Sequence, residues 1–149
     1  MLTNRTKYAL KALLYLARHR GEGRARAADI STAEQIPPKF LEQILHELRN
    51  KGMVRSQVGK GGGHELARDP EDIDLLSVIR AIEGPIAPLP CLSQTAYARC
   101  DDCPDENRCG ARRLMSQAYE ASLTALAGTA LADALSMTGD AKPGKRAKR

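Results

Sequence analysis

Residues 36–52 read IPPKFLEQILHELRNKG, and this stretch determines the fold that we expect for the chain. A proline is tolerated in the first turn of a helix, so Pro38 marks a helix start, and Gly52 suits the position just past the helix end. The apolar residues between them recur at helical spacing: Leu41, Ile44, Leu45 and Leu48. The stretch therefore predicts a helix from about Pro38 to Lys51 with one buried face.

The segments on either side of this helix complete a known motif. A short amphipathic helix is expected just before it, over Ala27 to Gln35, and two short helices joined by a tight turn form a helix-turn-helix. Residues 53–58 then alternate as a strand, residues 59–63 (GKGGG) form a loop, and residues 64–67 return as the partner strand. A hairpin in this place is the wing of a winged helix-turn-helix.

The remaining sequence predicts more helix. We expect a first helix over Asn4 to Arg18, and another that starts near Asp72 and ends at Gly84. A single long helix is expected over about residues 111–137. It carries more apolar surface than a small domain can cover, so pairing between two subunits is the natural use for it, and packing on its own domain is the alternative. Three small residues would let the paired helices approach closely: Ala127, Gly128 and Ala130.

The predicted fold class is thus mainly α with a small β-hairpin. The expected organisation is a winged helix-turn-helix DNA-binding domain (1–83), a cysteine loop that binds a cluster (84–110), a dimerisation helix (111–138) and a disordered basic tail (139–149). With 149 residues, the chain is long enough for one domain with a modest core.

The charge is distributed unevenly along the chain. The formal net charge is +5, but residues 1–63 hold 12 lysines and arginines against 5 acidic residues. Residues 64–138 hold 6 basic and 12 acidic residues. A basic first third suits a partner made of phosphates, such as double-stranded DNA.

Other classes of protein are disfavoured. No apolar run approaches the ~20 residues that span a bilayer, and the N-terminus lacks the features of a signal peptide, so we expect a cytoplasmic protein with no membrane partner. The chain has no Ser/His/Asp, paired-carboxylate or phosphate-loop arrangement, which argues against an enzyme.

Candidate DNA contacts follow from the helix-turn-helix and its wing. Residues in the first turns of the second helix enter the major groove, where Gln pairs with adenine, Glu accepts from cytosine and Lys reaches guanine or phosphate. Wing cations can touch phosphate or enter the minor groove. The expected contact residues are Pro38, Lys39, Phe40, Glu42, Gln43, His46, Arg55, Lys60 and Gly61.

All four cysteines lie between residues 91 and 109, in the pattern Cys91-x8-Cys100-x2-Cys103-x5-Cys109. Four thiolates can complete a tetrahedral zinc site or ligate an iron–sulfur cluster. A thiol/disulfide switch and unligated cysteines are the other interpretations that the spacing leaves open.

The chain resembles the Rrf-type family of winged-helix transcriptional regulators over about residues 1–135. The matching segments are Leu2-Thr3, Lys7-Tyr8-Ala9-Leu10, 36–52, Gly61-Gly62-Gly63 with Leu66-Ala67, 72–82, Cys91, Cys103-Pro104 and Cys109-Gly110. The resemblance implies a homodimer with crossed long helices, whose recognition helices enter the major grooves of a two-fold operator. It also implies a 2Fe–2S or 4Fe–4S cluster whose state sets operator affinity.

Two positions depart from the family pattern. Family members hold the cluster with three cysteines, matched here by Cys91, Cys103 and Cys109, together with a ligand that is not a cysteine. Cys100 is an additional thiol, and our hypothesis is that it supplies the fourth ligand within one chain, which favours a 4Fe–4S cluster or zinc. The second departure is Val58, which stands in the wing where relatives usually carry an arginine, so either Lys60 takes over its contact or the operator preference differs.

Overall fold

The computed structural model describes residues 3–139, so the basic tail beyond residue 139 lies outside it. The helices and strands in chain order are α1 (Asn4–Arg18), α2 (Ala27–Glu34), α3 (Pro38–Asn50), β1 (Val54–Gln57), β2 (Gly63–Leu66), α4 (Leu75–Glu83), α5 (Gly110–Ala127) and α6 (Leu131–Met137). Short 3₁₀ turns occur at Pro70–Asp72, Pro90–Leu92 and Glu106–Arg108. The order confirms the predicted fold class, a mostly helical chain with one hairpin.

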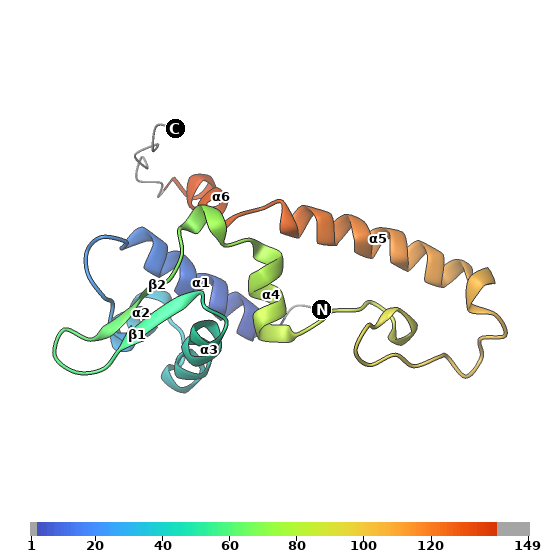
Figure 1. The fold of residues 1–149 in the computed structure, drawn as a ribbon, viewed down its shortest axis with the longest axis horizontal. Helices are drawn as coiled ribbons and strands as arrows, with labels where there is room; N and C mark the ends of the chain where they lie inside the picture. Colours follow the sequence, from blue (N-terminus) through green and yellow to red (C-terminus); the bar gives the residue numbers. More distant parts are fainter. Residues whose placement is uncertain (1–2, 140–149) are drawn as a thin grey trace.

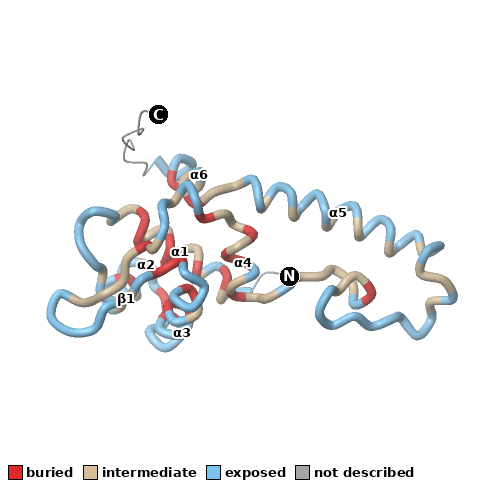
Figure 2. Tube along the Cα trace, in the orientation of Figure 1, coloured by how far each residue is buried: buried red, intermediate tan, exposed pale blue. Residues whose placement is uncertain are grey.

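The molecule has a dense end and an extended end (Figure 1). Helices α1–α4, α6 and the hairpin gather around one core, whereas α5 runs away from it above the cysteine-bearing loop. Buried residues are concentrated in the first part, and α5 contains none (Figure 2). Within residues 3–139 no helix combines the length and apolar character needed to cross a membrane.

The core of the winged-helix domain forms where α1 and α4 pack against α3. The predicted apolar stripe of α3 is confirmed, since its members are at most 2% exposed: Leu41, Ile44, Leu45 and Leu48. On α1, Ala9, Ala12 and Leu13 are completely buried. An Arg5–Glu47 ion pair ties α1 to α3 at the edge of this contact. The burial fixes which face of α3 points to solvent.

The turn between α2 and α3 is held by local hydrogen bonds. Gln35, expected inside the second helix, instead adopts a left-handed conformation with φ of 54°. The Ser31 hydroxyl donates to the Ile36 carbonyl at 2.7 Å, and the Ile36 amide donates to the Ser31 carbonyl at 3.1 Å. Ile36 is only 2% exposed, so its burial anchors the turn.

The hairpin gains a third, very short strand from the α1–α2 connection. β1 and β2 pair antiparallel with Val54 opposite Leu66 and Ser56 opposite His64. On the other edge of β2, Ala25 and His64 exchange two backbone hydrogen bonds of 2.9 and 2.7 Å. The wing is therefore fastened to the segment that precedes α2.

The helix that we expected to begin near Asp72 begins at Leu75. Asp74 caps α4 by accepting hydrogen bonds from the Ser77 amide at 2.8 Å and the Ser77 hydroxyl at 2.6 Å. Partial burial opposes ionisation of Asp74, but the hydrogen bonds from Ser77 outweigh it, and the pKa of the carboxyl is lowered. At the other end of α4, Glu83 accepts hydrogen bonds from the Thr3 amide and the Thr3 and Thr6 hydroxyls, which lower the pKa of Glu83.

The prediction of one long helix over residues 111–137 is wrong, because the chain breaks into α5 and α6 at Gly128–Ala130. The Leu75 amide donates to the Thr129 carbonyl at 2.9 Å, and the Leu131 amide donates to the Ile73 carbonyl at 2.8 Å. The Asp133 carboxylate then accepts from the Ala130 amide at 2.7 Å and starts α6. The break lets Leu131 and Leu135 enter the domain core. The small residues Ala127, Gly128 and Ala130 therefore lie at and beyond the end of α5, not along a continuous helix.

Replacing the α4 cap tests its contribution to stability. We expect Asp74→Ala to lower the free energy of unfolding by about 1 kcal/mol at neutral pH, because two helix-start hydrogen bonds are lost. Since the folded state lowers this pKa, the contribution is present at neutral pH and is lost as acid protonates the folded carboxyl. The difference from wild type in urea unfolding should therefore shrink on acidification. The exposed Asp72→Ala is the matched control, and equal losses for the two variants would contradict the cap.

Candidate nucleic-acid interface and cysteine loop

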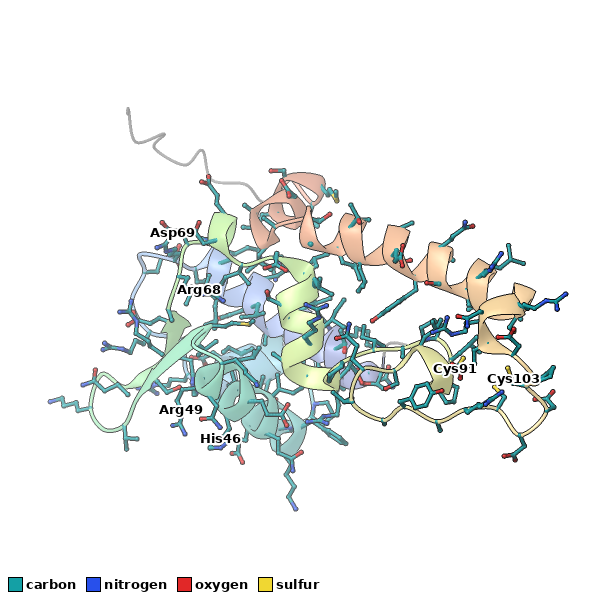
Figure 3. The ribbon with its side chains drawn as sticks, turned by 45° about the vertical axis from the view of Figure 1, so that its right-hand side comes forward. His46, Arg49, Arg68, Asp69, Cys91 and Cys103 are labelled. Carbon is teal, nitrogen blue, oxygen red and sulfur yellow. The ribbon has the colours of Figure 1, made fainter. Side chains whose placement is uncertain are left out.

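The solvent face of α3 carries every residue of this helix that was predicted to contact DNA. Because its apolar stripe turns inward, the opposite residues are all exposed: Pro38, Lys39, Phe40, Glu42, Gln43 and His46. Figure 3 shows His46 pointing away from the domain. The row offers donors, acceptors and a cation at the N-terminal turns of the helix, which suits readout of base edges in a major groove.

Phe40 adds an apolar contact surface to this row. It is the single phenylalanine of the chain and is 48% exposed, in a protein whose aromatic content is only 3%. An exposed apolar group beside polar readers is suited to contact with a thymine methyl group.

Arg49 belongs to the same face, although the sequence analysis did not select it. Its guanidinium donates to Nδ1 of His46 at 2.9 Å, and both residues are labelled on α3 in Figure 3. With Nδ1 accepting, a neutral His46 ring carries its proton on Nε2. The signal in the sequence was the spacing, since residues three apart on a helix are neighbours.

The wing presents the three predicted contact residues to solvent: Arg55, Lys60 and Gly61. The charge of Arg55 is partly neutralised, because its Nε lies 3.7 Å from the Glu65 carboxylate on the opposite strand. Lys60 has no ion pair within residues 3–139. Val58 is 96% exposed, so the wing offers an apolar side chain where an arginine was expected from the family pattern.

His64 is built into the base of the wing. Its Nδ1 lies 2.7 Å from the Ser56 hydroxyl on the paired strand. Partial burial, and secondarily the positive charge of Arg49, lower the pKa of His64. The ring is therefore neutral at neutral pH and adds no charge to the wing.

Three of the four cysteines lie in the folded loop that precedes α5. Cys91 is buried at 6% exposure in the turn Pro90–Leu92, and the Ala98 amide donates to the Pro90 carbonyl at 3.2 Å, which folds the loop back on this turn. The Cys103 amide donates to the Cys100 carbonyl at 3.2 Å. Cys91 and Cys103 lie beneath α5 in Figure 3, at the other end of the molecule from the wing.

The thiol of Cys100 is influenced by these neighbours. Loss of hydration raises its pKa first, followed by the proximity of Cys91, Asp102 and Cys103, although the residue as a whole is exposed. A raised pKa means that Cys100 is mostly protonated at neutral pH, and it must lose this proton before it can bind a metal.

Cys109 performs a different local role. It occupies the N-cap of α5, where its sulfur accepts a hydrogen bond from the Arg112 amide at 3.4 Å. The four thiols match the donor set of zinc or an iron–sulfur cluster in type and number. The arrangement of the thiols in the structure does not match a metal site, because within residues 3–139 no three Cys, His, Asp or Glu side chains are placed to hold a metal ion. Binding a metal would require the loop to draw its thiols together.

Comparison with known proteins identifies the family. The family model described as "Rrf2: Iron-dependent Transcriptional regulator" matches residues 2–136. The chain belongs to the Rrf2 family. An rrf2-like HTH-type transcriptional regulator of Rhodobacter capsulatus is 42% identical over 138 residues, which cover 91% of this chain and 92% of that protein.

Solved Rrf2-type structures share the fold. CymR, the global cysteine regulator of B. subtilis, gives a TM-score of 0.70 at 28% identity, covering 92% of this chain and 97% of that one. IscR of T. potens gives a TM-score of 0.69 at 25% identity, covering 100% of this chain and 93% of that one. The chain is thus an Rrf2 transcriptional regulator of the CymR and IscR type, and the predicted family resemblance is confirmed.

A substitution of Gln43 tests the exposed row of residues 38–46 on α3, which we call the recognition face. We expect Gln43→Ala to relax the preference for one base pair by about 1–3 kcal/mol, because a bidentate contact to a base edge is lost. Selection of binding sites from a random duplex pool, followed by affinity measurements, would reveal the change. The control is Gln94→Ala, which changes an exposed glutamine in the cysteine loop. If the wild type, Gln43→Ala and Gln94→Ala all select the same DNA sequence, Gln43 does not contact a base.

Proposed function

We propose that this Rrf2 regulator binds a two-fold DNA operator as a homodimer, with α3 in the major groove and the wing on the flanking backbone. The observation that carries the proposal is the continuous exposed row on α3 beside a wing whose Lys60 forms no ion pair with any residue that the structure describes. The basic first 63 residues supply the electrostatic attraction.

Dimerisation through α5 is the second part of the proposal. α5 has 18 residues and none of them is buried, whereas most helices in proteins are stabilised by packing of an apolar face. Its apolar side chains Leu114 and Met115 are 70% and 39% exposed. Beside α5, an apolar groove of about 490 Å³ lies between the helix and the segment 86–88, lined by Leu123 and Leu126 among others. A second copy of α5 suits this surface, because a two-fold axis brings the same apolar face from both subunits together.

The cysteine loop is proposed as the sensing element, with an iron–sulfur cluster as its cofactor. Four thiols in 19 residues support this, as does the amide that already donates to the Cys109 sulfur, since hydrogen bonds to sulfur tune thiolate ligands. The cluster would supply a redox- and iron-sensitive link between the thiols. Structural zinc is the alternative cofactor.

A thiol/disulfide switch is a second candidate, and a specific observation favours it. The Ala98 amide donates to the Pro90 carbonyl, which folds the segment just before Cys100 back on the turn that holds Cys91. Such a switch needs no metal. Mass spectrometry of the protein before and after reduction separates it from the cluster.

The position of the loop suggests how it would affect DNA binding. The turn Pro90–Leu92 contacts α5, and α5 contacts α4 of the winged-helix domain. Tyr119 of α5 also donates a hydrogen bond to the Ile86 carbonyl in the chain leading to the loop. A change in the loop would shift α5, and in a dimer this alters the spacing of the two recognition helices, on which operator binding depends.

Anaerobic purification tests the cofactor. We expect a coloured protein with bound iron, and Cys100→Ala should make the cluster less stable because one ligand is removed. A colourless protein with stoichiometric zinc would reject the cluster. A cluster that is equally stable in Cys100→Ala would reject Cys100 as the fourth ligand, and Ser93→Ala in the same loop is the control.

A charge placed on either face of α5 tests the dimer. Leu126 shares a face with Tyr119 and Leu123, whereas Gln117 lies on the opposite side of the helix. We expect Leu126→Glu to convert the dimer into monomer in sedimentation equilibrium, because a carboxylate would be buried at the interface. Gln117→Glu should remain dimeric. A dimer that tolerates both changes equally would place the interface elsewhere.

A further inference from the structure

A cationic cleft lies beside the wing, and one of its walls carries Arg24 and Arg26, which were not among the predicted DNA contacts. The cleft has a volume of about 700 Å³ and separates the segment 23–27 from the wing. Arg24 and Arg26 line one wall, and Lys60 with the glycines 59 and 61–63 lines the other. No carboxylate from residues 3–139 lines it.

The two walls are held together by backbone contacts. The paired hydrogen bonds between Ala25 and His64 join them at the base. Gly63 makes this approach feasible, because a Cβ at this position would lie 2.6 Å from the Ala25 carbonyl oxygen, and its φ is +142°. Backbone hydrogen bonds therefore fix the two walls of the cleft relative to each other.

The arginines reach the cleft because of the local backbone. Ala25 pairs with β2 in an extended conformation and packs against the hydrophobic core. Side chains on either side of an extended residue point to the opposite face, so Arg24 and Arg26 both point away from the core. The sequence GRARA showed this alternation, but only the pairing with β2 places it beside the wing.

The charge available in the cleft comes mainly from two groups. Arg24 lies 3.4 Å from the Glu65 carboxylate and is partly neutralised. Arg26 is exposed and, like Lys60, has no ion pair within residues 3–139. His64 also lines the cleft, but its lowered pKa keeps it neutral. Arg26 and Lys60 therefore supply the unneutralised positive charge of the cleft, one from each wall.

We propose that this cleft binds the sugar–phosphate backbone of duplex DNA, with Arg26 and Lys60 on either side of the strand. The inference rests on the proposed DNA-binding function and extends it to a contact that is independent of sequence. The cleft is continuous with the wing, so a duplex that touches the wing passes beside it. Glycines in the wall let phosphate oxygens approach the backbone closely. A free nucleotide is disfavoured because the glycine loop leads into a strand and not into a helix.

The salt dependence of binding to a mixed-sequence duplex tests the proposal, since phosphate contacts need no operator. We expect Arg26→Gln to reduce the slope of log K against log salt by about 0.9, the value for one lost phosphate contact. Arg26→Lys should restore most of the slope. Arg80→Gln removes an equal charge from the exposed face of α4 and should leave the slope at its wild-type value.

The outcomes separate this inference from the function on which it rests. If the wild type binds duplex DNA but Arg26→Gln keeps its slope, the cleft proposal is wrong and the proposed function stands. If the wild type binds no duplex at low salt, the proposed function itself fails. Tight binding of pyrophosphate that Arg26→Gln abolishes, with the DNA slope unchanged, would also overturn the proposal in favour of a small anion.

Discussion

The burial of one face of α3 against α1 and α4 is the contact on which the rest of the structure depends. Leu41, Ile44 and Leu48 leave no rotational freedom to the helix, because turning it would expose them and bury Glu42 and Gln43. The same contact positions β1, which follows α3 directly, and through β2 it positions the segment before α2. Recognition face, wing and cationic cleft are therefore parts of one rigid unit.

The break at Gly128–Ala130 has the opposite effect on the second half of the chain. By returning Leu131 and Leu135 to the core, it uses α6 to complete the winged-helix domain. α5 is then left without a buried residue and extends over the cysteine loop. An exposed helix joined at both ends to packed segments is suited to the role proposed for it, which is to carry a change from the cysteine loop to a second subunit.

The cysteine loop is ordered by backbone hydrogen bonds, but within residues 3–139 its thiols are not arranged as a metal site. Backbone hydrogen bonds bring Cys91, Cys100 and Cys103 to one region, while Cys109 begins α5. Cys109 carries a thiol and is also the N-cap of α5. A ligand or an oxidation that moves this residue therefore acts directly on the start of the helix. Cys109 thus adds a direct link between chemistry at the sulfurs and the geometry of the proposed dimer.

The sequence by itself determined the recognition helix and its outward residues, because a helical period and a Pro38 start are local properties. It also determined the hairpin and the clustering of thiols. The tertiary structure alone decided that residues 111–137 form two helices, since the break is fixed by hydrogen bonds to Ile73 and Leu75, far away in the chain. It likewise decided that Arg26 and Lys60 line the same cleft, because a β-bridge between Ala25 and His64 joins segments that no local pattern relates.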